Sequence, residues 1–87
     1  MAVLYKLPEN AVLGDTIYSE KILDIENNPI EDVRCYVTNL SDNETILVEN
    51  TTNSQGIVRF QLYVGEYNLW CEKSGFTFNN PNYIEVF

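Results

Sequence analysis

Two runs of alternating apolar and polar residues constrain this chain more than any other feature. The first run covers residues 57–62 and the second covers residues 67–71. Turn-forming residues precede the first run at 52–56, separate the two runs at Val64-Gly65 and follow the second run at 73–75. Alternation with a period of two is typical of a half-buried β-strand, so the two runs predict a β-hairpin.

The register of this hairpin follows from which side chains share a face. Residues of equal parity in a strand point to one face, and residues opposite one another in a pair do so too. One register gathers the apolar side chains of both runs on one face, and it pairs Leu62 with Tyr67, Phe60 with Leu69 and Val58 with Cys71. A slip of one residue would expose half of this set. Connecting loops of two and of four residues both satisfy the register.

Arg59 and Trp70 would then face each other on the outer side of the hairpin. A guanidinium over an indole ring contributes roughly 0.5–1 kcal/mol when it is exposed. Two interpretations stay open. Arg59 either covers a half-exposed ring, or it forms part of a contact surface together with Trp70 and Tyr63. Tyr36 also points away from the predicted core and extends that candidate surface.

The rest of the chain adds short strands and shows no helical periodicity. We expect strands over residues 16–25, 33–39, 45–50 and 83–87, with turns or polar loops between them. Roughly seven short strands with frequent turns predict an all-β fold, an immunoglobulin-like or transthyretin-like antiparallel β-sandwich. The predicted core collects the inward-facing residues Val33, Cys35, Val37, Val58, Phe60, Leu62, Tyr67, Leu69 and Cys71.

Residues 1–14 are mildly apolar and are punctuated by Pro8 and Gly14. We expect them to form either an edge strand or an arm that packs on a neighbour, with Leu4 and Tyr5 as its contact candidates. Residues 15–87 would form one sandwich domain, which suits a chain of 87 residues.

The charge and the missing histidine exclude several classes of function. The chain carries a formal net charge of −8 and has no histidine. An acidic surface disfavours DNA, RNA and anionic membranes as partners. Without histidine the chain lacks the commonest general base and a frequent zinc ligand, and no loop has the ligand pattern of a calcium site. We therefore expect no enzyme activity, no metal and no cofactor.

The two cysteines, Cys35 and Cys71, both fall on predicted inward faces. Buried free thiols and a disulfide between the two are both compatible with this pattern, whereas the spacing fits no zinc motif. The N-terminal residues lack a basic stretch followed by a long apolar run, so we expect neither a signal peptide nor a membrane span.

Four motifs occur in the order and spacing of a known family. Segment 23–37, LDIENNPIEDVRCYV, has an Asp, a turn, a Pro with an aliphatic residue and an alternating strand. Residues 52–60 follow the pattern T-D-x-x-G-x-x-x-F with Asn53 in place of Asp, residues 65–69 follow G-x-Y-x-L, and Gly75-Phe76 is a Gly-aromatic pair. Together they resemble the carboxypeptidase-regulatory-like domains. The resemblance covers the chain from about residue 17 onward and implies a transthyretin-like sandwich, usually a non-catalytic module.

The related collagen-adhesin B-type domains often carry a Lys–Asn isopeptide bond promoted by a buried Glu. At the matching positions this chain has Cys71 instead of Glu, and Lys21 lies one residue out of step. Each departure turns the side chain to the other face, so we expect no isopeptide bond.

These features favour a non-enzymatic structural or interaction module. A small acidic sandwich without a signal peptide resembles accessory proteins of phage virions. That resemblance implies a virion location after assembly in the host cytoplasm, and a protein partner, either a larger shell protein or further copies in a homo-oligomer. Docking would use the sheet face, the edges or the N-terminal segment. The alternative is a carbohydrate-binding module that uses Trp70 and Tyr36.

Overall fold

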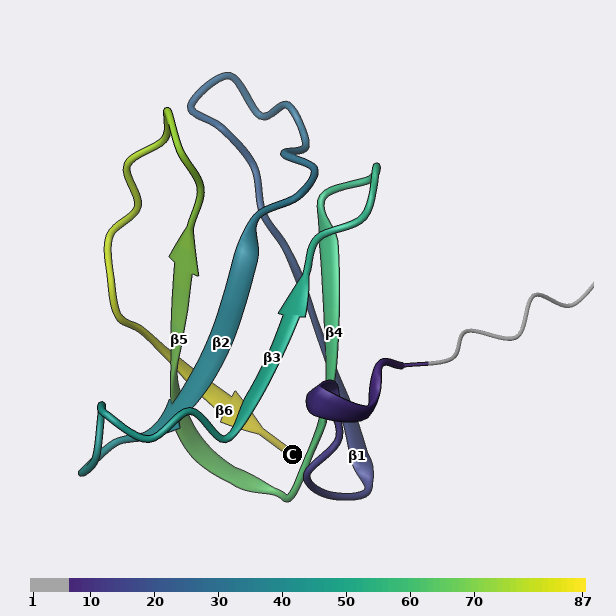
Figure 1. Cartoon of the computed structure of the whole chain (residues 1–87), viewed down its shortest axis with the longest axis vertical. Coiled ribbons are helices and arrows are strands. Elements are labelled where there is room, and N and C mark those ends of the chain that lie inside the picture. The colour runs from purple at the N-terminus through teal and green to yellow at the C-terminus, as the bar shows by residue number, and fades with distance from the viewer. Residues whose placement is uncertain (1–6) are drawn as a thin grey trace, which may run out of the picture.

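A computed structural model describes residues 7–87, which fold into two antiparallel sheets packed as a sandwich (Figure 1). One sheet pairs β1 with β4, and the other has the order β3-β2-β5-β6. The predicted all-β fold class is confirmed, with six strands in the described residues. The elements are η1 (Glu9–Ala11), β1 (Thr16–Lys21), β2 (Arg34–Asn39), β3 (Val48–Thr51), β4 (Ile57–Leu62), β5 (Gly65–Glu72) and β6 (Asn82–Val86).

The two alternating runs form strands β4 and β5, but the predicted pairing between them is wrong. Among the strands of residues 7–87, β4 has β1 as its one neighbour, and β5 lies between β2 and β6 in the other sheet. The pairs Leu62–Tyr67, Phe60–Leu69 and Val58–Cys71 therefore do not form. The turn after Leu62 carries the chain from one sheet to the other. Parity could not exclude this arrangement, because a hairpin and a turn between sheets bury the same side chains.

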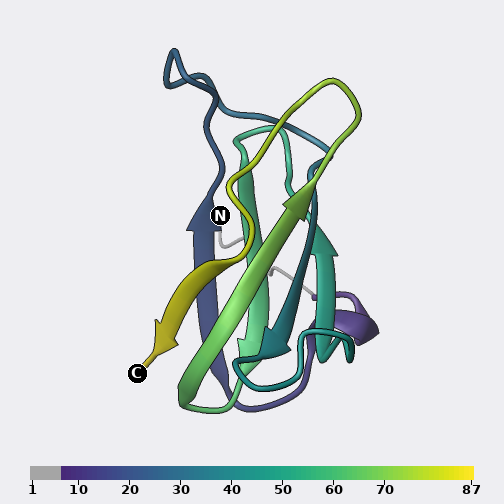
Figure 2. The same ribbon diagram turned by 90° about the vertical axis from the view of Figure 1, so that its left-hand side faces the viewer.

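The core lies between the two sheets and contains every residue predicted for it. The apolar faces of β4 and β5 point toward each other across the interior instead of lying side by side. Figure 2 shows β1 and β3 on opposite sides of the molecule, with β5 running between them in that view. Phe60 and Leu69 are among the largest fully buried side chains. Other segments complete the core with Ala11, Ile30, Val48, Ile84 and Val86.

The first strand is shorter than predicted, because a side chain ends it. β1 stops at Lys21, and only a single bridge between Leu23 and Pro29 follows it. The Asp24 carboxylate accepts hydrogen bonds from the main-chain N–H groups of Glu26 and Asn28, at 2.9 Å each. These bonds hold the predicted turn closed and keep residues up to 25 out of the strand.

The strand predicted over 45–50 begins later, at Val48, for a similar reason. The Asp42 carboxylate accepts hydrogen bonds from the main-chain N–H groups of Glu44 and Thr45. Ile46, which would share a face with Val48 in the predicted strand, is exposed, whereas Val48 is buried. The C-terminal strand forms almost as predicted, as β6.

The described part of the predicted N-terminal arm packs on its own domain. Ala11 in η1 is fully buried, and Val12 forms a single parallel bridge with Gln61 of β4. The main-chain N–H groups of Leu13 and Gly14 donate to the carbonyl of Gln61. Leu4 and Tyr5, the contact candidates of the arm, lie outside the described residues.

A side chain links the two sheets at the side of the sandwich where β3 lies next to β4. There the Asn50 side chain on β3 donates a 2.7 Å hydrogen bond to the Arg59 carbonyl on β4. At the other side, no main-chain hydrogen bond within residues 7–87 links β1 to β6. The structure contains no helix long and apolar enough to cross a bilayer in the part it describes.

Candidate functional site

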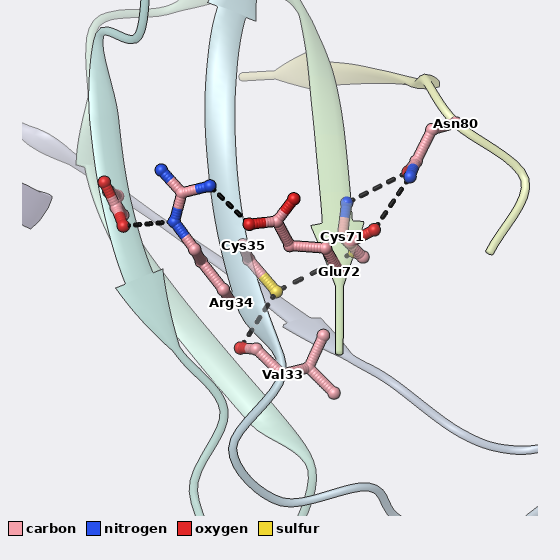
Figure 3. Close-up of polar contacts among 7 residues, drawn as sticks. Val33, Arg34, Cys35, Cys71, Glu72 and Asn80 are labelled. Carbon is pink, nitrogen blue, oxygen red and sulfur yellow. Dashed lines mark hydrogen bonds and ion pairs between the residues drawn. The ribbon is translucent and has the colours of Figure 1, made fainter. Parts of the chain in front are cut away.

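The outer face of the four-stranded sheet carries a row of charges across three strands. Arg34 on β2 lies between Glu49 on β3 and Glu72 on β5 and forms an ion pair with each at 2.5 Å. Figure 3 shows the Arg34 guanidinium directed toward the Glu72 carboxylate. The hydrogen bond from Arg34 holds the pKa of Glu49 below its ordinary value. All three side chains are partly exposed, so the row contributes modestly to stability.

The aromatic residues of this face form a stack next to the charges. Tyr36 and Trp70 are directly opposite on β2 and β5, with ring planes 1° apart and centroids 6.1 Å apart. The Arg34 guanidinium carbon lies 4.7 Å from the centroid of the Tyr36 ring. The indole N–H of Trp70 donates to the Thr38 hydroxyl at 3.0 Å. The predicted candidates Tyr36 and Trp70 are therefore brought together. One face of the Tyr36 ring and the indole N–H of Trp70 are already occupied by contacts within the domain.

A loop side chain completes this face at its far end. The Asn43 side-chain oxygen accepts hydrogen bonds from the Thr38 hydroxyl and from the Asn68 amide. Thr38 is fully buried although it points outward, because Trp70 and the loop cover it. The alternation of residues along β2 could not reveal this cover, because Asn43 and Trp70 come from other parts of the chain.

The predicted contact between Arg59 and Trp70 is wrong. Arg59 lies on β4 opposite Ser19 of β1, in the other sheet, whereas Trp70 faces Tyr36. Tyr63 is also separated from Trp70, because it follows β4 at the turn between the sheets, where it is exposed. The predicted surface of Trp70, Arg59, Tyr36 and Tyr63 thus divides into three separate places.

The two cysteines face each other on neighbouring strands inside the sandwich. Cys35 on β2 is paired with Cys71 on β5, and their sulfur atoms lie 3.7 Å apart as free thiols. The Asn80 side chain holds Cys71 from the other side, since it accepts from the Cys71 N–H and donates to its carbonyl (Figure 3). A shallow depression of about 470 Å³ lies beside the end of β5.

The described residues form no cluster of side chains that could bind a metal ion. Within residues 7–87, no three His, Cys, Asp or Glu side chains are placed to hold a metal ion together. The depression beside β5 is lined by Arg34, Lys73 and two phenylalanines among others, and Lys73 is occupied by a hydrogen bond to the Glu31 carbonyl.

One end of the sandwich gathers exposed apolar side chains, of which only Tyr63 was among the contact candidates predicted from the sequence. At this end the start of β1, the turn between β4 and β5, and the C-terminus lie together (Figure 1). The register supports this, since Thr16 pairs with Leu62, and Gly65 pairs with Val86. Half of the twelve exposed large apolar side chains among residues 7–87 lie in these segments. They are Val12, Leu13, Ile17, Tyr63, Val64 and Phe87, here named the apolar end.

Among residues 7–87, the charged side chains next to the apolar end are acidic. Asp15, Glu66 and Glu85 lie within or next to its segments and are exposed. The Tyr83 hydroxyl donates its single proton to Glu66, at 2.5 Å, with the Glu85 carboxylate as a second acceptor at 3.2 Å. The described basic residues Lys21, Arg34 and Lys73 lie at the opposite ends of their strands or beyond them, and Arg59 lies in the middle of β4. The apolar end is therefore bordered by negative charge.

Comparisons with family models, with curated proteins and with solved structures found no match to this chain.

Proposed function

We propose that the protein is a non-enzymatic structural module that docks onto a larger protein through its apolar end. The observation that supports this is the exposure of that end, where Ile17, Val64 and Phe87 are 63%, 65% and 87% exposed. Single exposed apolar residues are common on soluble proteins, but a group of them at one place is typical of a protein contact.

The acidic border favours a partner of a different kind over a second copy of this chain. Two copies that met through this end would bring Glu66, Glu85 and Asp15 close to their own counterparts. Like charges across an interface cost binding energy, whereas a basic border on the partner would add to it. We propose a partner with an apolar patch surrounded by Lys and Arg, bound at a fixed ratio.

The likeness to small phage accessory proteins, noted from the sequence, extends this proposal. In that setting the partner is a protein of the head or tail shell, and the complex assembles in the host cytoplasm. This extension depends on sequence resemblance and on the sandwich-like fold, and a fold of this kind serves many functions.

The docking proposal is tested by native capture with matched variants from an extract of the organism that makes the protein. Val64→Glu, with Tyr63→Ser as a second variant, should abolish recovery of one partner at a fixed ratio. Ile25→Ser is the control, since Ile25 is fully exposed in the loop between β1 and β2. The recovered amount should fall with added salt. Equal recovery with the Val64 and Ile25 variants would refute docking through the apolar end.

Carbohydrate binding is the second candidate, and the parallel rings of Tyr36 and Trp70 are the observation that favours it. Arg34 already covers one face of the Tyr36 ring, so Trp70 would provide most of the surface for a sugar. A saturable change of Trp70 fluorescence with an oligosaccharide, absent in Tyr36→Ala, would support this function. A flat response across a broad glycan panel would count against it.

A further inference from the structure

The two buried thiols occupy the kind of site at which antiparallel strands accept a disulfide. In an antiparallel ladder, directly opposite residues alternate between pairs that exchange main-chain hydrogen bonds and closer pairs that do not. Both main-chain groups of Cys71 bond to the Asn80 side chain. They therefore point away from β2, and Cys35–Cys71 is a closer, non-hydrogen-bonded pair.

The hydrogen bonds of β2 also indicate that Cys35–Cys71 is a non-hydrogen-bonded pair. The Val37 carbonyl on β2 accepts a hydrogen bond from Leu47, on the β3 side, and Cys35 has the same parity as Val37. The main-chain groups of Cys35 thus point toward β3 and leave the space between the two cysteines to their side chains. The Cα separation typical of such a pair, about 4.5 Å, lies within the range that a disulfide spans.

We propose that Cys35 and Cys71 form a dithiol that closes to an intramolecular cross-strand disulfide in the folded protein, with a glutathione-type disulfide as the oxidant. The sulfur atoms are already 3.7 Å apart, so side-chain rotation is enough to bring them to bonding distance. The closed form would link β2 to β5 at the position next to the Tyr36–Trp70 pair and hold these two strands in register.

The surroundings of the two sulfur atoms differ, and the difference indicates which thiolate attacks the oxidant first. The hydrogen bond between the thiols lowers the pKa of Cys71, while the same hydrogen bond and then burial raise the pKa of Cys35. The Cys35 thiol also donates toward the Val33 carbonyl at 3.6 Å, which holds its proton and leaves Cys71 as the attacking thiolate. Cys71 lies at the lining of the depression beside β5, but it is only 2% exposed and Cys35 is 0% exposed. For the oxidant to reach Cys71, the segment that carries Asn80 would have to move away from β5 and break its two hydrogen bonds to Cys71.

The reaction is a thiol–disulfide exchange in two steps. The Cys71 thiolate attacks one sulfur of glutathione disulfide, its S–S bond breaks, and one glutathione thiolate leaves. The Cys35 thiolate then attacks the Cys71 sulfur of the mixed disulfide and releases the second glutathione thiolate. The dithiol loses two electrons and two protons, and glutathione disulfide gains them to become two glutathione thiols.

The test incubates the reduced full chain with glutathione disulfide under native conditions and then blocks the remaining thiols for mass spectrometry. We expect one intramolecular Cys35–Cys71 link, a monomeric product and a native circular dichroism spectrum. The thermal midpoint should rise by on the order of 10 °C, because the cross-link closes a long loop in the unfolded chain, and reductant should reverse the rise.

Cys35→Ala is the matched control, since it keeps the attacking thiol and removes its partner. It should form at most a mixed disulfide and show no rise of the midpoint on oxidation. Three results would overturn the proposal: native protein that stays reduced while the same chain closes in urea, a product that is intermolecular or carries glutathione, or a disulfide that lowers the thermal midpoint. The wild-type comparison of reduced and oxidised protein decides the matter even if the variant does not fold.

Discussion

At the scale of single residues, buried polar groups of this domain are satisfied by side chains far away in the sequence. Thr52 is the clearest case, being 2% exposed. Its hydroxyl accepts from the Val33 N–H at 2.9 Å and donates to the Ile30 carbonyl at 2.7 Å. It thereby fixes the entry to β2 against the end of β3. From the sequence, Thr52 is only the first residue of a turn, because nothing local identifies Val33 as its partner.

Thr52→Val should therefore cost about 1–3 kcal/mol of unfolding free energy. The replacement has nearly the same shape but leaves a buried N–H and a buried carbonyl without partners. Thr51→Val is the control, since Thr51 is exposed, and we expect a change within about 0.5 kcal/mol there. Urea unfolding of both variants measures the difference, and equal costs would contradict the role of the Thr52 hydroxyl.

The ion pair between Arg34 and Glu49 predicts a pH dependence with a definite sign. Because the pKa of Glu49 in the folded protein lies below its ordinary value of 4.5, the pair contributes stability above that value. The contribution is lost as the pH falls through the lower pKa of the folded state. Glu49→Gln should therefore reduce the urea midpoint at pH 7 and have little effect near pH 2.

Glu44→Gln provides the comparison for this prediction, since it removes the same charge from the exposed loop before β3. Its effect on the urea midpoint should be small, and the effect should not show the pH dependence expected for Glu49→Gln. A loss for Glu49→Gln that is as large near pH 2 as at pH 7 would show that the carboxylate charge is not the cause.

At the scale of elements, the turns were predicted well and the strand partners were not. The segment 52–56 forms the predicted turn, in which the Asn53 side chain accepts from the N–H groups of Gln55 and Ile57. Turns are local, so their residue types carry the signal. Strand partners depend on the whole chain, and alternation says only which face is buried. For this reason the core residues were identified correctly while β4 and β5 were paired with each other.

Two glycines with similar backbone angles offer a test of this turn. Gly56 has φ 74° and Gly75 has φ 87°, both unfavourable for other residues. A Cβ at Gly56 would lie 2.7 Å from the Ile22 carbonyl oxygen, whereas one at Gly75 would meet nothing within 4 Å. Gly75→Ala should cost roughly 1–2 kcal/mol from the backbone angle alone.

Gly56→Ala should cost at least about 1 kcal/mol more than Gly75→Ala, since the main chain near Ile22 must also shift. Thermal or urea unfolding of the two variants gives the comparison. Equal costs would mean that the turn and the end of β1 are not in contact as described.

At the scale of the whole molecule, the candidate surfaces depend on which strands are neighbours. The sequence placed Trp70, Tyr36, Arg59 and Tyr63 on outer faces, but only the sheet order shows that Tyr36 and Trp70 meet. The apolar end could not be predicted, because its residues come from three segments that only the fold brings together. The same is true of the facing cysteines, which the hairpin register had separated by pairing Cys71 with Val58.

The fold differs from the predicted hairpin in one respect above all: β4 and β5 belong to different sheets, and β2 is the neighbour of β5. Nuclear Overhauser contacts between Hα protons test it directly, since these protons are closest in non-hydrogen-bonded antiparallel pairs. The structure predicts strong Hα–Hα contacts between Cys35 and Cys71 and between Val37 and Leu69, and none between β4 and β5. Strong contacts between Val58 and Cys71 or between Phe60 and Leu69 would instead establish the hairpin and contradict the two-sheet arrangement.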